Sequence, residues 1–165
     1  MLIIEKAQIS DIPLIRQLTM QVWPQTYTPI LGNEQVSYML EKFYAPESLA
    51  EQIRDAGHQF IICYSDEEPV GFASYGLIAE KVFKLHKLYV LRGLQGKGIG
   101  KFMISYVVSE ITKAEATALM LNVNIHNQSA IAFYQKNGFS KYKEEDIDIG
   151  SGYYMNDYVF RMAVE

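Results

Sequence analysis

A glycine-rich stretch between two predicted elements is the part of this sequence best suited to chemistry. Residues 95–100 read Gln-Gly-Lys-Gly-Ile-Gly and stand between a predicted strand and a predicted amphipathic helix. Glycines let the backbone turn tightly, so several N–H groups can converge at the N-terminus of the helix. Unpaired N–H groups and the helix dipole both favour an anion there. The stretch therefore predicts a phosphate-binding loop, although such a loop can also simply join a strand to a helix.

Two familiar phosphate loops do not match this stretch. The G-x-x-x-x-G-K-[ST] loop finds its glycine spacing at Gly93 and Gly98, but Ile99 and Gly100 follow in place of lysine and a hydroxyl residue. The dinucleotide fingerprint G-x-G-x-x-G fails because position 101 is lysine, and because the acidic residues that follow are misplaced for it.

Three segments together resemble the GNAT family of acetyl-CoA-dependent N-acetyltransferases. The first is the loop itself, which fits Q/R-x-x-G-x-G/A and follows the run Leu-Tyr-Val-Leu-Arg at 88–92. The second is Asn-Gln-Ser-Ala at 127–130, similar to the family's N-x-x-A element. The third is Phe-Tyr-Gln-Lys-Asn-Gly-Phe at 133–139, similar to F-Y-x-x-x-G-F. The resemblance is strong over residues 60–140 and extends elsewhere in element order only.

The resemblance implies that acetyl-CoA is the cosubstrate and that no metal is needed. Backbone groups of Leu88 and Val90 would pair with the pantetheine arm, while their side chains remain free to pack in the core. Asn127 would lie close to the same arm, although asparagine is also a common residue at a helix N-cap. The backbone N–H groups that would hold the pyrophosphate belong to Gln95, Gly96, Lys97, Gly98, Ile99, Gly100 and Lys101.

Two side chains are candidates for acid–base chemistry. By resemblance, the Tyr134 phenol would lie beside the thioester sulfur and donate to the departing thiolate, the alternative being a packed tyrosine. Many relatives carry a glutamate at the position of Lys84, or at that of His86. A histidine with a pKa near ~6.5 is a competent base at neutral pH, so His86 is the candidate base. Alternation along the strand would place His86 on one face with Lys84, Leu88 and Val90, and the positive charge of Lys84 would there lower the pKa of His86. A structural histidine, a water chain, or less favourably His126, are the alternatives, and His58 is expected to be structural.

The acceptor site of this family is lined by the N-terminal helices and the last strands. Trp23, Tyr27 and Tyr38 form an aromatic set there, for which core packing is the alternative. An acidic run could steer a cationic amine or simply face solvent; it comprises Glu144, Glu145, Asp146 and Asp148.

The expected reaction is acetyl transfer to a primary amine by direct attack, because the lone Cys63 lies in a predicted buried strand and is unsuited to an acyl-enzyme. The N-terminal layout resembles that of PaiA-type polyamine acetyltransferases, which favours a small amine or polyamine. N-terminal (ribosomal-protein) or lysine protein acetyltransferases are the alternative acceptor class. A non-catalytic module that senses acetyl-CoA is the alternative of another class.

Composition restricts the setting. The chain has 165 residues, which predicts one domain over 1–165, and 15 Lys and Arg against 19 Asp and Glu, which argues against nucleic-acid binding. The N-terminus is not typical of a signal peptide, and no 18 consecutive residues are apolar, so we expect a cytoplasmic protein that does not bind membranes. The oligomeric state stays open, with a homodimer as one alternative.

Periodicity predicts a mixed α/β fold. Strands are expected at 2–4, 60–64, 70–77, 84–90, 119–124, 140–149 and 153–164. Helices are expected from 10 to Pro24, at 34–43, from Pro46 to Gly57, around Ile104–Ile111, and at about 129–137. The resemblance adds a mostly antiparallel twisted sheet, flanked by helices, with a V-shaped splay between the fourth and fifth strands.

Overall fold

A seven-stranded sheet forms the centre of the molecule, with strand order β1-β2-β3-β4-β5-β7-β6. The computed structural model describes residues 1–165. Only β4 and β5 are parallel, and every other neighbouring pair is antiparallel, which confirms the predicted mixed α/β class. The strands are β1 (Leu2–Lys6), β2 (Gln59–Ser65), β3 (Glu68–Ala79), β4 (Val82–Val90), β5 (Ala118–Asn124), β6 (Ser140–Gly150) and β7 (Tyr153–Ala163). The helices are η1 (Ile9–Asp11), α1 (Ile12–Leu31), α2 (Asn33–Tyr44), α3 (Pro46–Arg54), α4 (Ile99–Lys113) and α5 (Gln128–Lys136).

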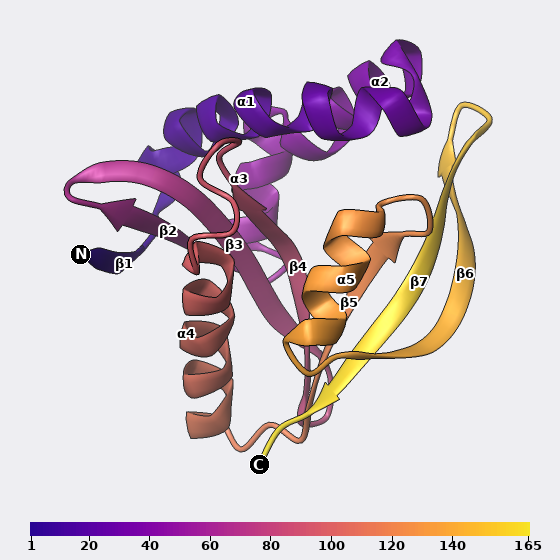
Figure 1. The fold of residues 1–165 in the computed structure, drawn as a ribbon. Helices are drawn as coiled ribbons and strands as arrows, with labels where there is room; N and C mark the ends of the chain where they lie inside the picture. Colours follow the sequence, from indigo (N-terminus) through magenta and orange to yellow (C-terminus); the bar gives the residue numbers. More distant parts are fainter.

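The sheet splits between β4 and β5. These strands pair over four positions only, from Val82 opposite Ala118 to Leu85 opposite Leu121. Beyond Leu85, β4 continues to Val90 with β3 as its only partner, whereas β5 continues alongside β7. The two strands diverge there, as Figure 1 shows, so the predicted V-shaped splay is confirmed.

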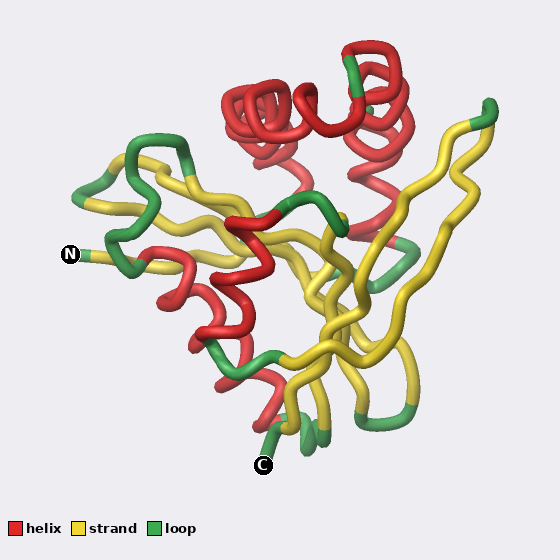
Figure 2. Tube along the Cα trace, turned by 45° about the vertical axis from the view of Figure 1, so that its right-hand side comes forward, coloured by secondary structure: helices red, strands yellow, loops and turns green.

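The helices cover the two faces of the sheet in two groups (Figures 1 and 2). Alternate residues of a strand face opposite sides, and on β2 Phe60 and Ile62 belong to one core while Ile61 and Cys63 belong to the other. The first core is filled by α1, α2 and α3, and the second by α4 with part of α5. None of these helices combines the length and the apolar character needed to cross a bilayer.

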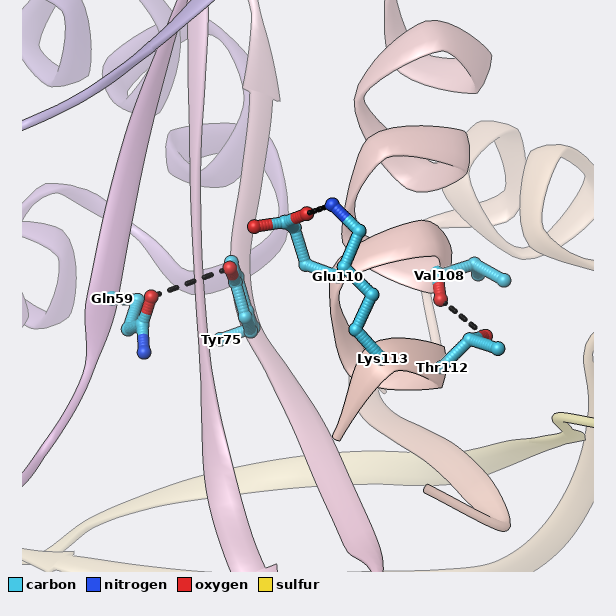
Figure 3. A network of polar contacts seen from close by, with 6 residues as sticks. All are labelled: Gln59, Tyr75, Val108, Glu110, Thr112 and Lys113. Carbon is cyan, nitrogen blue, oxygen red and sulfur yellow. Dashed lines mark hydrogen bonds and ion pairs between the residues drawn. The ribbon is translucent and has the colours of Figure 1, made fainter. Parts of the chain in front are cut away.

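The C-terminal half of α4 is held by local polar contacts away from the splay (Figure 3). Lys113 Nζ lies 2.6 Å from Glu110 Oε2, and the Thr112 hydroxyl donates to the Val108 carbonyl at 2.6 Å. Beneath the helix, burial raises the pKa of Tyr75 to about 12. These contacts fix the helix end that is remote from the glycine-rich loop.

The prediction that α1 ends at Pro24 is wrong. The helix runs through Pro24 and Pro29 to Leu31, and Gly32, whose φ is +84°, is its C-cap. A proline inside a helix costs about 3 kcal/mol, whereas burying a large apolar side chain contributes about 1.5–3 kcal/mol. Val22 and Trp23 are both buried in the first core, so packing against the sheet outweighs the local preference. The extension carries Tyr27 over the splay.

A β-bulge at His86 changes which residues of β4 share a face. Ser74 is opposite Lys87 but Tyr75 is opposite Leu85, so His86 is an extra residue in β4. Unbroken alternation would place Leu85 and Leu88 on opposite faces, yet both pack in the core under α4. Because alternation is interrupted, the shared face that it predicts for Lys84, His86 and Leu88 is not kept.

Candidate active site

A cavity of about 1090 Å³ opens where β4 and β5 diverge. Its wall is built by β4, the loop after it, the first turn of α4, the end of β5, α5, parts of β6 and β7, and the helices α1, α2 and α3. The structure brings nearly all the predicted site residues to this wall: Trp23, Tyr27, His86, Leu88, Val90, Gln95, Gly96, Gly98, Ile99, Gly100, Lys101, Asn127 and Tyr134. Lys97 is the exception, because it is exposed and does not line the cavity.

The glycine-rich loop leaves the N-terminus of α4 free for an anion. Gly93, Gly96 and Gly98 all have φ between +82° and +86°, a region that favours glycine. No side chain caps α4, its first turn holds no acidic residue, and the first amide bonded back to the loop is that of Phe102. The preceding N–H groups therefore stay available to a ligand. Three cations on the same cavity wall add positive charge: Arg92, Lys101 and Lys136.

Gly100, the last glycine of the 95–100 stretch, lies in the first turn of α4 and has a packing role. A Cβ at Gly100 would stand 2.8 Å from Cζ of Phe133, so α5 could not approach α4 this closely with any larger residue. Contact between the loop and the Phe-Tyr segment at 133–134 therefore depends on glycine at this position.

The free edge of β4 runs from the loop toward the sheet. Leu88 and Val90 turn their side chains into the core under α4, while their backbone has no strand on the β5 side. Core packing of the side chains is therefore compatible with a backbone edge that stays open, and pairing of a cofactor arm with this edge stays a prediction. An extended ligand arm could pair there as an added strand does.

Tyr134 lies on the cavity wall with its ring edge-on to Phe133 and Phe139. Burial raises the pKa of its phenol, and Tyr27 adds to the effect. The hydroxyl therefore keeps its proton at neutral pH. It has no hydrogen-bond partner among the protein groups, so it can donate to a molecule in the cavity.

Asn127 lies on the cavity wall at the start of α5. Its Oδ1 accepts from the Ala130 amide at 3.4 Å, which makes it the N-cap predicted as one alternative. It also lines the cavity and interacts with the Tyr27 phenol, whose pKa is raised chiefly by burial. Trp23 packs on Tyr27 at 4.4 Å between ring centroids, so both aromatic residues serve packing and cavity lining at once.

The family model described as "Acetyltransferase (GNAT) family" matches residues 16–139, about three quarters of the chain. The chain belongs to the GNAT acetyltransferase family. It is accordingly an acetyl-CoA-dependent acyltransferase, and its loop, free strand edge and α4 N-terminus fit a molecule with a pyrophosphate and an extended arm.

Relatives and solved structures agree with this assignment. The chain is 20% identical over 147 residues to an uncharacterized N-acetyltransferase in the pepI 3' region of Lactobacillus delbrueckii subsp. lactis, with 85% of each chain covered. It superposes on the PaiA N-acetyltransferase of Thermoplasma acidophilum, solved in complex with coenzyme A, with a TM-score of 0.83, 24% identity and 99% of each chain covered. The ribosomal-protein-S18-alanine N-acetyltransferase of Escherichia coli gives a TM-score of 0.74 at 15% identity, covering 100% of this chain and 95% of that one.

In this GNAT acetyltransferase, Asp157 of β7 is a site residue that the sequence analysis missed. Its side chain lines the cavity although the residue is only 6% exposed. Burial raises the pKa of the carboxyl, while Asn122, which donates to it at 3.3 Å, and nearby Lys84 act in the opposite direction. The sequence carries a signal for it: Met155, Asp157 and Val159 alternate along β7 and share one face, so an acidic residue stands on a face that is otherwise apolar.

His86 lines the cavity but is a weaker base than the sequence suggested. Burial lowers its pKa to about 3, and His58, Lys84 and Lys87 add to the effect. The influence of Lys84 has the predicted direction, but burial and the stacked His58 ring contribute more. The charged imidazole is therefore less stable here than in water, which places the pKa of His86 below the ordinary histidine value on which its role as a base rested.

Several other candidates lie outside the cavity. The Tyr38 hydroxyl donates to the Ile149 carbonyl at 2.6 Å and holds α2 to the β6–β7 hairpin. Cys63 is buried and does not line the cavity, and His126 is exposed outside it. The acidic run is also outside: Glu144, Asp146 and Asp148 are exposed and Glu145 pairs with Lys143 at 2.8 Å. The solvated alternative therefore holds for the acidic run.

Proposed function

We propose that this enzyme transfers the acetyl group of acetyl-CoA to the primary amine of a small molecule by direct attack. The observation that carries the proposal is the continuity of the cavity, which joins the α4 N-terminus, the free β4 edge, Tyr134 and a polar end beneath α1. Cys63 is buried and does not line this cavity, which supports a route without an acyl-enzyme.

Tyr134 would serve as a hydrogen-bond donor to the departing sulfur. A thiol has a pKa near ~8.5, below that of an ordinary phenol, and burial moves the phenol further up. Complete proton transfer from Tyr134 to a thiolate is therefore uphill. A donated hydrogen bond stabilises the negative charge that develops on sulfur and leaves the proton on the phenol.

Asp157 would accept the proton of the attacking amine. A free alkyl amine with a pKa near ~10.4 is largely protonated at pH 7, so a group in the cavity has to hold that proton. A carboxylate with a raised pKa is better matched to this task than an imidazole whose pKa has fallen to about 3. In this proposal His86 is a neutral side chain that lines the cavity and takes no part in the proton transfer.

Contacts between α2 and the β6–β7 hairpin favour a small acceptor over a polypeptide. Tyr38 bonds to Ile149, and Gln35 Nε2 donates to the Tyr154 carbonyl at 2.8 Å. These bonds bridge the two elements beside the part of the cavity where the amine would lie. An extended peptide would need an open groove there. The alternative acceptor class, a polypeptide, is represented among the structural neighbours by the ribosomal-protein-S18-alanine N-acetyltransferase of Escherichia coli.

The test is thiol release from acetyl-CoA with a panel of small amines and with peptides that carry a free N-terminal amine. Turnover with small amines, and little with peptides, is the expected result. Turnover with peptides alone would contradict the acceptor class. Tight binding of acetyl-CoA without turnover of any amine would favour the sensing module instead.

A further inference from the structure

Two lysines of β4 line the same cavity in different electrostatic surroundings. Lys84 faces Asp157 and Glu145, two carboxylates that favour its charged form. Lys87 lies across the bulge at His86 and faces α2, α3 and β2 instead. No carboxylate forms an ion pair with it.

The immediate contacts of Lys87 are one amide oxygen and two aromatic rings. Its Nζ donates to Gln52 Oε1 at 2.7 Å. The same nitrogen lies 5.2 Å from the ring centroid of Tyr44 and 5.5 Å from that of Phe60. An ammonium group has three N–H donors, and aromatic faces attract the charge without accepting as a carboxylate does. The cation at this point of the wall therefore lacks a counter-ion.

Without a counter-ion, the charged form of Lys87 is less stable than it would be in an ion pair. Burial lowers the pKa of Lys87 to about 8, and Lys84 adds to the effect. Because this pKa still lies above 7, most molecules carry the charge at neutral pH. A largely buried cation without a counter-ion is costly, so an anion delivered by a ligand would be bound strongly.

We propose that Lys87 binds an anionic group of the acceptor, so that the preferred substrate is a primary amine that also carries a carboxylate or a phosphate. This inference rests on the proposed function and narrows its substrate class. The reacting amine would lie toward Asp157 and the anionic group toward Lys87, which gives the acceptor one orientation in the cavity. A polyamine would instead bring a further ammonium group toward Lys84 and Lys87, and like charges repel.

The experiment compares short primary amines that differ mainly in the group at the other end of the molecule. The probes are β-alanine, O-phosphoethanolamine, propylamine and 1,3-diaminopropane, with thiol release followed at pH 7. In the unaltered enzyme, kcat/KM is expected to be highest for one of the two anionic amines, and their order distinguishes carboxylate from phosphate. Lys87→Met should reduce the ratio of kcat/KM between that amine and propylamine by roughly 10- to 100-fold. Lys6→Met makes the same change in net charge at an exposed residue of β1 and should leave the ratio unaltered.

A second variant guards against loss of folding in Lys87→Met. Gln52→Glu keeps the lysine and supplies a counter-ion at the position of the present hydrogen bond. It should raise KM for the anionic amine and lower the same selectivity ratio. The loss of the Gln52 Nε2 bond to the Phe43 carbonyl, 3.0 Å long, would affect all acceptors alike.

Binding gives a readout that does not depend on turnover. With coenzyme A present, β-alanine or O-phosphoethanolamine should raise the Tm of the unaltered protein and not that of Lys87→Met. Turnover in which propylamine or the diamine equals the anionic amines, with a ratio unchanged by Lys87→Met, would overturn the anion site and leave the proposed function standing. An anion-dependent Tm shift without turnover of any amine would overturn the proposed function and keep the anion site.

Discussion

The imidazole rings of His58 and His86 are stacked, with their centroids 3.8 Å apart and an angle of 11° between their planes. The arrangement suits two neutral rings, since two imidazolium ions at this distance would repel. Burial lowers the pKa of His58 to about 4 and that of His86 to about 3. His58 Nδ1 is buried without a partner, so the pair is held by packing between the α3–β2 connection and the bulge of β4.

This pair predicts a loss of stability in mild acid. Below pH 6.5 these two histidines bind protons in the unfolded chain but stay neutral in the folded protein. The free energy of unfolding should therefore fall as pH drops from 6.5 toward 4. The slope is at most about 1.4 kcal/mol per pH unit for each histidine. Urea unfolding at pH 7, 6 and 5 measures it, and His86→Gln should reduce the slope. His126→Gln changes an exposed histidine outside the cavity and is the control. Equal slopes in all three proteins would contradict the attribution of this pH dependence to the His58–His86 pair.

The loop predicts a specific loss of coenzyme binding in Gly98→Val. Gly98 has a φ of +83°, and a non-glycine residue there is strained by about 1–2 kcal/mol. Its side chain would also project beside the α4 N-terminus, where free N–H groups are available. Calorimetry should show weakened acetyl-CoA binding. Gly152→Val places a comparable strain at a φ of +81° in the remote β6–β7 turn, and it should bind acetyl-CoA normally. Normal binding by Gly98→Val would remove the loop from the coenzyme site.

The sequence predicted the elements that local pattern controls. The order of strands and helices, the loop, and the positions of Tyr134 and Asn127 all follow from motifs or periodicity within short segments. The path of α1 beyond Pro24 did not, because tertiary burial of Val22 and Trp23 outweighs a local helix breaker. The bulge at His86 depends on the register between β3 and β4, and the inward position of Asp157 depends on the pairing of β7 with β5, which is distant in sequence. Those two features set the charges that line the cavity, and no pattern within one short segment could predict them.

Tyr134→Phe is predicted to lower kcat while acetyl-CoA affinity stays nearly constant. Only the hydroxyl is removed, and its ring packing on Phe133 and Phe139 remains. Loss of one donor to a developing negative charge costs about 10²–10³-fold in kcat. Single-turnover kinetics separate chemistry from product release, and Tyr142→Phe, at an exposed tyrosine, is the control. An unchanged chemical step would reduce Tyr134 to a packing residue.

Asp157→Asn should make the enzyme slower and the fold more stable. The carboxyl pKa is raised in the folded state, so the folded protein binds its proton more tightly than the unfolded chain does. The stability that this provides is present at low pH and is lost as pH rises through the folded pKa. At pH 7 the buried charge therefore destabilises the fold, and a neutral amide, which can still accept from Asn122, should raise Tm. The same substitution removes the proton acceptor, with acetyl-CoA binding preserved. In the unaltered enzyme kcat/KM should fall in acid as Asp157 becomes protonated, and Asp157→Asn should abolish this acidic limb of the pH profile. A limb that survives in Asp157→Asn would assign the base elsewhere. A lower Tm at pH 7 would show instead that Lys84 and Asn122 compensate the burial of this carboxylate in full.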